Sequence, residues 1–433
     1  MNAIEEFEEI SGRLKRVSFG GFDGYRVDKI LTIPTQEVLK GAFNLNIIQF
    51  FKSLLGTLFR DGYQYTFESV KDARVVFFYS HTHALRKDYV HFMETVASCT
   101  EDAVLFSGKN NPNGVMSSIK IRFSSIKMIF LLLLWMWQFY IVGIRMKYWK
   151  KFLTSLLASY KWKCLLIKNK ELLTSISSMV SIFDAREFEN VFAQFLSHQG
   201  IPTATLQHGH YGSEFYYDSD HFYIGIGYRG FVSDYFLLWG DTSYKGAVEC
   251  GIPKARLIKV GNPYLIVPEK VFGARGTIGV LFDGGDESIP DNKQMYSIAK
   301  RFAAKNNKKL LVKLHPSYKT AEFTFFMGDE NVDLFSGDLK TFAESVEMTI
   351  CCNTSCLITL LIWECKMLHY APSFMIDVYE ELQQYSFSNY DELVLLDQKD
   401  FTPSTLLSLY SEIDNVKDNY RNAINRMITI NNN

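Results

Sequence analysis

Short apolar runs alternate with amphipathic stretches along most of the chain, a pattern that predicts strands separated by helices. In the first half the apolar runs lie at 74–79, 103–106, 179–184, 203–206, 235–240 and 257–260. The stretch from Glu187 to Gln199 has helical spacing, and Gly200 and Pro202 follow it as helix stop signals. Strands that alternate with helices predict β-α-β units around a parallel sheet.

A second series of the same kind begins after residue 276. Its predicted strands lie at 278–282, 310–314, 348–352, 367–370 and 393–396, and its predicted helices at 293–304, 339–345, 357–363 and 403–430. The stretch 268–276 breaks the pattern and predicts a linker. The sequence therefore predicts an α/β protein with two doubly wound, Rossmann-like domains that face each other across a cleft. We place the first domain at 1–268 and the second at 269–433.

One apolar run is too long for a strand. From Met128 to Ile144 the chain has 17 residues, including Gln138, and Lys127 precedes them. Four cations follow: Arg145, Lys147, Lys150 and Lys151. A helix of this length spans about 25 Å, less than the roughly 30 Å of a hydrocarbon core. A buried core helix, a helix in the membrane interface and a true span stay open. We expect the helical segment to cover 126–151, and its basic flank and two Trp residues favour membrane-surface contact.

Composition and charge narrow the classes of function. The chain has 433 residues, 47% of them hydrophobic, enough apolar material for two packed domains. The chain has 46 Lys and Arg residues and 47 Asp and Glu residues, which give a formal net charge of −1. This charge balance gives no electrostatic reason to expect nucleic-acid binding. The first residues are acidic and contain no apolar signal segment. We expect a cytoplasmic protein, peripheral at the inner face of the cell membrane.

The sequence predicts neither a metal ion nor another cofactor. The motif Asp218-Ser-Asp220 has the spacing of a metal-binding Asp-x-Asp, but it lies in a Tyr-rich stretch rather than after a strand. The seven cysteines form no C-x-x-C pair, although three of them lie close together at 351, 352 and 356. We interpret the cysteines as buried thiols in a reducing compartment, with a metal site as the alternative.

Polar side chains follow several predicted strands, at the sheet edge where doubly wound folds bind their ligands. In the first half they are Asp184, Gln207, His208 and His210. In the second half they are Asp283-Gly284, His315-Pro316 and Asn353-Thr354-Ser355. A histidine after a strand can be structural, and Thr354 or Ser355 can be a helix N-cap. Hydroxyls and backbone N–H groups at a helix start also bind phosphate, so both roles can hold together.

The order of short motifs along the chain resembles a known family. The segments 202–209, 234–240, 251–253 and 260–263 are followed by Val312-Lys-Leu-His-Pro316 and by Asn353-Thr-Ser-Cys-Leu-Ile358. This succession is similar to bacterial surface-polysaccharide glycosyltransferases of the two-domain GT-B fold. The last two motifs are similar to the His-Pro and hydroxyl motifs of polysialyltransferases, Kdo transferases and teichoic-acid glycerophosphotransferases. The resemblance covers residues 175 to 372.

The resemblance implies a role for each motif. Donor nucleotide and phosphate binding is implied for Gly284, His315, Pro316, Asn353, Thr354 and Ser355, with His315 assisting departure of the leaving group. We place Gln207, His208, His210 and Asp184 on the acceptor side, and either His208 or Asp283 is the expected base. Three positions depart from the family pattern. Phe282 stands where relatives have an acid, Thr359 where they often have Glu, and Glu364-Cys365 where Gly is usual.

These motifs predict a metal-independent, inverting glycosyltransferase. It would move a sugar or polyol-phosphate from a CMP-, CDP- or UDP-linked donor to a capsule, O-antigen or related polysaccharide. The acceptor would be an oligosaccharide or a lipid-linked precursor. The leaving nucleotide develops phosphate charge, which hydrogen-bond donors can neutralise, and inversion needs one base for the acceptor hydroxyl. Two alternatives stay open: a nucleotide-sugar 2-epimerase-like enzyme on the same scaffold, and a catalytically silent scaffold of a polysaccharide assembly.

Overall fold

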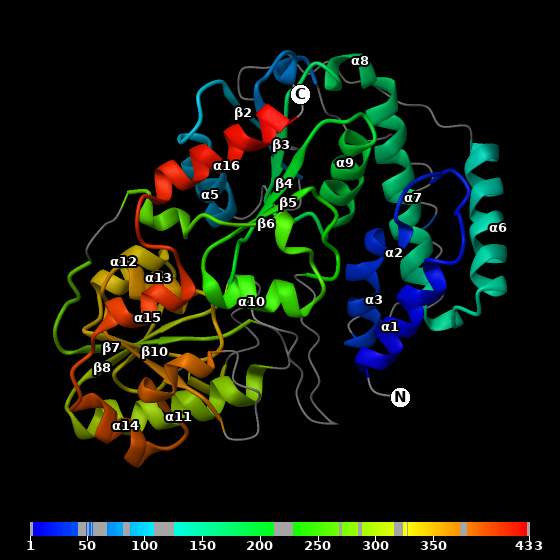
Figure 1. Cartoon of the computed structure of the whole chain (residues 1–433). Coiled ribbons are helices and arrows are strands. Elements are labelled where there is room, and N and C mark those ends of the chain that lie inside the picture. Colours follow the sequence, from blue (N-terminus) through cyan, green and yellow to red (C-terminus); the bar gives the residue numbers. More distant parts are fainter. Residues whose placement is uncertain are drawn as a thin grey trace.

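Two parallel sheets organise the molecule. The computed structural model describes residues 3–41, 67–80, 87–107, 125–211, 228–267, 271–284, 288–315, 324–326, 328–372 and 379–430, with single positions at 49, 52 and 54. Within these ranges the chain forms two sheets of six strands each (Figure 1). This architecture confirms the predicted fold class, two doubly wound domains of the GT-B type.

The first sheet has the strand order β2-β1-β3-β4-β5-β6. Its strands are β1 (Val75–Tyr79), β2 (Ala103–Ser107), β3 (Met179–Ser181), β4 (Thr203–Leu206), β5 (Tyr235–Leu238) and β6 (Leu257–Lys259). Three crossover helices are α5 (Lys87–Ala97), α9 (Glu187–Ser197) and α10 (Asp241–Glu249). Every residue of β1, β3 and β4 is buried, as expected for strands of a parallel sheet covered on both faces.

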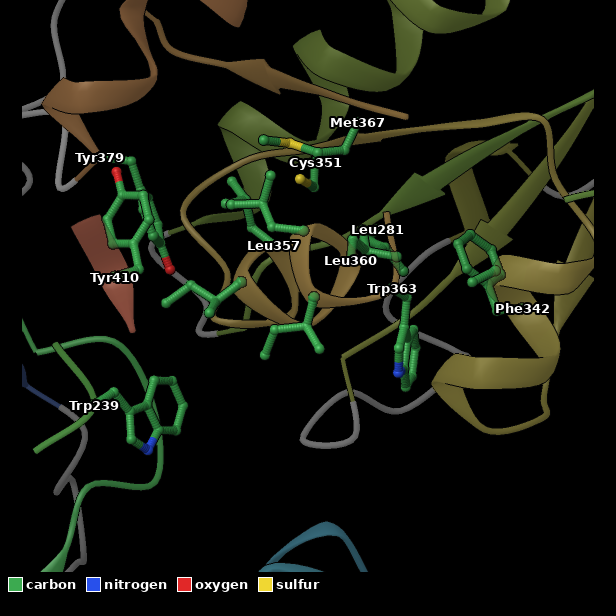
Figure 2. Packing of buried hydrophobic residues seen from close by; sticks show 14 of the residues in the cluster. Trp239, Leu281, Phe342, Cys351, Leu357, Leu360, Trp363, Met367, Tyr379 and Tyr410 are labelled. Atoms are coloured by element: carbon green, nitrogen blue, oxygen red, sulfur yellow. The ribbon is translucent and has the colours of Figure 1, made fainter. Parts of the chain in front are cut away.

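The second sheet has the order β12-β11-β10-β7-β8-β9. Its strands are β7 (Thr277–Leu281), β8 (Lys309–Lys313), β9 (Val332–Phe335), β10 (Met348–Cys351), β11 (Met367–Tyr370) and β12 (Ser386–Phe387). Its helices are α11 (Ile289–Lys305), α12 (Leu339–Glu344), α13 (Cys356–Ile362), α14 (Tyr390–Asp397) and α15 (Pro403–Tyr410). Figure 2 shows Leu357 and Leu360 of α13 packed in the core with Cys351 of β10.

Some predicted elements of the second domain are wrong. The predicted strand 393–396 lies inside α14, because the Asn389 side chain accepts from the N–H groups of Asp391 and Glu392 and starts a helix. The predicted helix 403–430 is two helices, α15 and α16 (Val416–Ile430). The sequence pattern also misses β9 and β12. An edge strand such as β9, with Leu334 exposed, has no clear apolar alternation.

The last helix returns to the first domain. The Tyr420 hydroxyl of α16 donates to the Gly261 carbonyl at 3.0 Å, and Arg421 Nε donates to the Cys99 carbonyl at 3.3 Å. Figure 1 shows α16 in red beside α5 and β2. The predicted boundary near residue 268 separates the two sheets, whereas α16, which that division places in the second domain, packs on the first.

A helical layer covers one side of the first sheet (Figure 1). It contains α1 (Ala3–Leu14), α2 (Val27–Ile30), α3 (Thr32–Leu39), α6 (Ser125–Ile141), α7 (Met146–Lys168) and the short α8 (Lys170–Leu173). Helix α7 packs on α9 and α3, and α6 packs on the outer side of α7. In the described part of the chain, no helix combines the length and the apolar character that a membrane crossing needs.

Candidate functional site

The carboxyl ends of the two sheets meet. A Cβ atom built on Gly209, just after β4, would lie 3.7 Å from the Ser355 Oγ atom at the start of α13. His210 stacks on Tyr379, with ring centroids 4.6 Å apart and planes at 25°. Tyr379 lies beside Tyr410, as Figure 2 shows, with centroids 5.7 Å apart. The structure thus brings the predicted acceptor-side cluster next to the predicted phosphate-binding hydroxyls.

Two predicted donor residues, Gly284 and His315, touch each other. They follow β7 and β8, whose register pairs Leu281 with Lys313, so both lie just beyond the same sheet edge. A Cβ atom on Gly284 would lie 2.5 Å from His315 Nδ1, which is far inside contact distance. Gly284 therefore lets the His315 imidazole lie directly against the backbone of the turn after β7.

Asp283 shapes that same turn. Its Oδ1 accepts the Gly284 N–H at 2.8 Å, and its Oδ2 accepts the Ser288 hydroxyl at 3.2 Å. The Asn292 side chain bonds both the N–H and the carbonyl of Asp283, at 3.0 Å each. The Asp283 carboxylate thus already accepts two hydrogen bonds that keep Gly284 in place.

Phe282, the residue before Asp283, belongs to the core. Its ring is buried and stacks on Phe325, with centroids 5.8 Å apart. Phe282 is therefore a packing residue, and among the described residues of this turn Asp283 carries the carboxylate nearest to the strand end.

The two hydroxyl residues of the Asn353-Thr354-Ser355 motif have different roles. Thr354 is buried, and its Oγ1 accepts from the Cys356 N–H at 3.4 Å, so it helps to start α13. Ser355 is partly exposed, makes no capping bond through its side chain and faces Gly209. Because α13 has only seven residues, phosphate binding here would depend on hydroxyl and N–H donors more than on a helix dipole.

A buried histidine that the sequence motifs did not assign to the site positions Asn353. His369 on β11 is fully buried, with Nε2 3.2 Å from Asn353 Oδ1 and Nδ1 2.9 Å from Ser386 Oγ. Burial lowers the pKa of His369 to about 3, so the ring is neutral near neutral pH. An amide oxygen can only accept, so the bond assigns the proton to Nε2. The signal in the sequence that could have identified the pair of His369 and Asn353 is the alternation of side chains along β11 beside the end of β10.

The neutral state of His369 predicts a pH-dependent contribution to stability. The unfolded chain takes up a proton near pH 6.5 and the folded chain only near pH 3, so acid favours unfolding between these values. We expect the free energy of unfolding of wild type, relative to His369→Gln, to fall by up to about 1.4 kcal/mol per pH unit below about pH 6.5. Urea unfolding of both proteins at pH 7, 6 and 5 measures it. Parallel pH dependences would contradict the assignment.

Gln207 is a structural residue of the first domain. It is fully buried; its Oε1 accepts the Trp239 N–H at 2.7 Å, and its Nε2 donates to the Gly209 carbonyl and to Ser243 Oγ. These bonds join the ends of β4 and β5 to α10. Both the oxygen and the nitrogen of the Gln207 amide are used in these bonds, so we interpret Gln207 as a residue that holds Gly209 in place rather than one that contacts the acceptor substrate.

Asp184 is equally occupied. Its Oδ2 accepts the N–H groups of Val232 and Ser233 at 3.0 and 2.7 Å, and its carbonyl accepts from Asn190 Nδ2 at 2.7 Å. Burial raises the pKa of the Asp184 carboxyl. The side chain lies in the interior and holds the segment before β5, so a direct contact with an acceptor is not what this geometry offers.

His208 occupies an aromatic surround on the acceptor side. Its ring lies 4.5 Å from Phe183, 5.1 Å from Tyr89 and 5.3 Å from Tyr211, measured between centroids. The Tyr211 hydroxyl is 2.7 Å from His208 Nδ1. The sequence analysis did not identify these three aromatic residues, which come from α5 and from the segments after β3 and β4. They fix the imidazole at the carboxyl end of β4.

The predicted donor-side residue Pro316 lies outside the described residues, and so does the Asp218-Ser-Asp220 motif that the sequence analysis did not assign to a metal. Among the residues that are described, no group of three or more His, Cys, Asp or Glu side chains could hold a metal ion. All seven cysteines are free thiols, and burial raises the pKa of Cys351 and Cys352.

No protein-family model matches the sequence, and no curated protein matches it. Solved structures with a similar chain path include the UDP-GlcNAc 2-epimerase from Neisseria meningitidis, with 9% identity, a TM-score of 0.49 and coverage of 82% of this chain and 99% of that one. The UDP-N-acetylglucosamine 2-epimerase from Rickettsia bellii has 9% identity, a TM-score of 0.47 and coverage of 83% and 96%. The wall teichoic acid polymerase TagF has 11% identity, a TM-score of 0.45 and coverage of 95% and 100%. These similarities are too distant to indicate the reaction.

Proposed function

We propose that this protein transfers a glycosyl or polyol-phosphate group from a nucleotide-activated donor to a hydroxyl of a surface polysaccharide or its precursor. The observation that supports this most is the approach of Gly209 to Ser355, because it sets His208 and the donor-side residues at one junction between the sheets. A transferase must hold two substrates at such a junction. A polar cluster on each side of it meets this requirement.

The donor would lie on the second domain. His315, Asn353 and Ser355 all follow strands of the second sheet and offer hydrogen-bond donors to phosphate oxygens. When the bond between the transferred group and the nucleotide breaks, its electron pair passes to the phosphate oxygen. Donors already oriented there stabilise the new charge without reorganising. Asn353 is oriented by His369, and His315 by its contact with Gly284.

The acceptor hydroxyl would lie near His208. The Tyr211 hydroxyl oxygen lies 2.7 Å from His208 Nδ1 and 3.2 Å from Nε2, so it orients the imidazole that would take the hydroxyl proton as the new bond forms. We favour His208 over Asp283 as the base, since the Asp283 carboxylate already accepts two hydrogen bonds from its own turn. His210, stacked on Tyr379, would border the same junction.

The reaction is tested by nucleotide release. The proposal expects release from a CMP-, CDP- or UDP-linked donor only when a polysaccharide or lipid-linked acceptor is present. A change of sugar configuration without acceptor, followed by proton NMR, would indicate a 2-epimerase-like enzyme instead. Absence of any turnover with every donor and acceptor pair would leave a scaffold as the function.

Divalent metal is not part of the proposed mechanism, because hydroxyl, amide and imidazole donors neutralise the leaving phosphate. We therefore expect the transfer rate to be unchanged in excess EDTA, measured after dialysis against the chelator. An activity that disappears with EDTA and returns with Mg²⁺ or Mn²⁺ would contradict this part of the proposal.

The proposal also includes a location at the inner face of the cell membrane. Nucleotide-activated donors dissolve in water, whereas a lipid-linked acceptor stays in the bilayer. An enzyme that joins the two gains from peripheral membrane contact.

A further inference from the structure

Helix α6 exposes an apolar face. Seven of its side chains are between 37% and 68% exposed, and all are apolar or aromatic: Ile129, Phe130, Leu133, Met136, Trp137, Tyr140 and Ile141. At 100° per residue they occupy a single continuous arc of the helix. Figure 1 places α6 at the outer rim of the molecule, beyond α7. Large side chains gathered in this way usually mark an interaction surface.

The opposite face of α6 is packed and explains its polar residue. Trp135 and Phe139 are fully buried, with Trp135 Nε1 donating to the Gly20 carbonyl at 2.9 Å. Gln138 Nε2 donates to the Ser18 carbonyl at 2.9 Å, so the amide serves the protein. One face of α6 is thus packed against the protein, and the prediction of a buried core helix holds for that face alone.

Charges at the ends of α6 suit an anionic surface. The segment 125–141 contains no acidic residue, and Lys127 near its start is exposed. After it, Arg145 and Lys147 share the single carboxylate of Glu6, at 3.2 and 2.8 Å, with side chains 59% and 48% exposed. In this cluster the two exposed cations exceed the carboxylate that they share by one charge.

A second copy of the chain is a poorer occupant. Stable protein interfaces bury about 800 Å² per partner from about 20–30 residues, whereas this arc presents seven side chains on one protruding helix. A bilayer requires no complementary shape. Trp and Tyr, both present on the arc, are the residues that collect at membrane–water interfaces.

We propose that the exposed face of α6 docks the protein on an anionic phospholipid bilayer, with the helix in the plane of the interface. This names the membrane partner of the proposed function and rests on that function for its biological use. The apolar side chains supply most of the binding. The basic flank contributes less than the sequence predicts, because Lys151 pairs with Glu37, and Arg145 and Lys147 with Glu6.

Vesicle co-sedimentation tests the docking face. Wild type is expected to bind phosphatidylcholine vesicles that contain phosphatidylglycerol, and to bind them only partly less at high salt. The affinity of the triple variant Phe130→Ser/Leu133→Ser/Trp137→Ser for these vesicles should be lower than that of wild type by about tenfold or more. A matched control, Val267→Ser/Phe272→Ser/Leu395→Ser, removes three similarly exposed apolar side chains elsewhere and should bind like wild type.

Equal binding of wild type and the α6 triple variant, or no binding by wild type, would overturn the proposal. So would a wild-type dimer, seen by light scattering without lipid, that the triple variant converts to a monomer. Thermal unfolding of each variant checks that it folds. Nucleotide binding should be unchanged in the triple variant; a protein that binds vesicles but no nucleotide would contradict the proposed function and leave this surface standing.

Discussion

Replacing His315 with Ala is expected to lower kcat/KM for the donor by about 100-fold or more, because an oriented donor to the leaving phosphate is lost. Gly284→Ala should have a similar effect, since the added Cβ would lie 2.5 Å from His315 Nδ1 and displace the ring. As both changes remove the same interaction, the double variant should be no slower than either single one. Steady-state rates of the three variants measure it.

His198→Ala is the control for this series. His198 follows α9 and packs on Tyr25, with centroids 4.9 Å apart. It lies toward the amino end of β4, opposite to the carboxyl end where the site residues lie. It should keep the wild-type rate. If His315→Ala also kept the wild-type rate, the proposed donor-binding role of His315 would be wrong. Additive losses in the double variant would show that Gly284 does not act through His315.

Gly240→Ala should destabilise the fold by about 1–3 kcal/mol. A Cβ atom on Gly240 would lie 2.6 Å from the Ser411 nitrogen and the Tyr410 carbonyl carbon, which are backbone atoms that cannot rotate away. This is where the chain crosses between domains: Asn262 N–H donates to Ser411 Oγ at 2.8 Å, and Glu412 N–H donates to the Trp239 carbonyl at 2.8 Å. The change therefore pushes the crossing off the first sheet.

Urea unfolding measures the loss, with Gly12→Ala as the control. Gly12 lies in α1, and a Cβ atom there would meet nothing within 4 Å. That control should be neutral or stabilising by up to about 1 kcal/mol, because Ala favours helix over Gly. An unfolding midpoint for Gly240→Ala equal to that of wild type would show that the crossing is not tightly packed.

The sequence predicts the sheets well because a strand covered on both faces is a short, wholly apolar run. Strands β1, β4 and β10 are buried at every position. The same signal fails at 393–396, where an equally apolar run is one face of α14, and the deciding feature is the Asn389 cap. The predicted helical segment 126–151 is wrong as one helix, because α6 ends at Ile141 and α7 begins at Met146, with Gly143 between them at φ +72°. Residue type alone also does not tell which face of α6 packs against the protein.

The candidate site follows from the sequence only in part. Strand ends identify the sheet edge, so His208, His315 and Ser355 could be placed there without coordinates. Whether a side chain at that edge is available depends on its hydrogen bonds, which sequence spacing does not contain. Gln207 and Asp184 have the right position, yet backbone N–H groups already occupy their acceptor oxygens. The support of Asn353 by His369 depends on strand register, which appears only in the fold.

The most direct test of the central claim is a binding titration of CMP, CDP, UDP and their sugars against wild type and His315→Ala. Calorimetry gives the affinity, and the rise in melting temperature confirms that the folded state binds. The account predicts that at least one of these ligands binds wild type. It also predicts that the affinity of His315→Ala for that ligand is lower by about tenfold or more, a loss of about 1.4 kcal/mol or more of binding free energy. Binding of no nucleotide, or equal binding by both proteins, would contradict it.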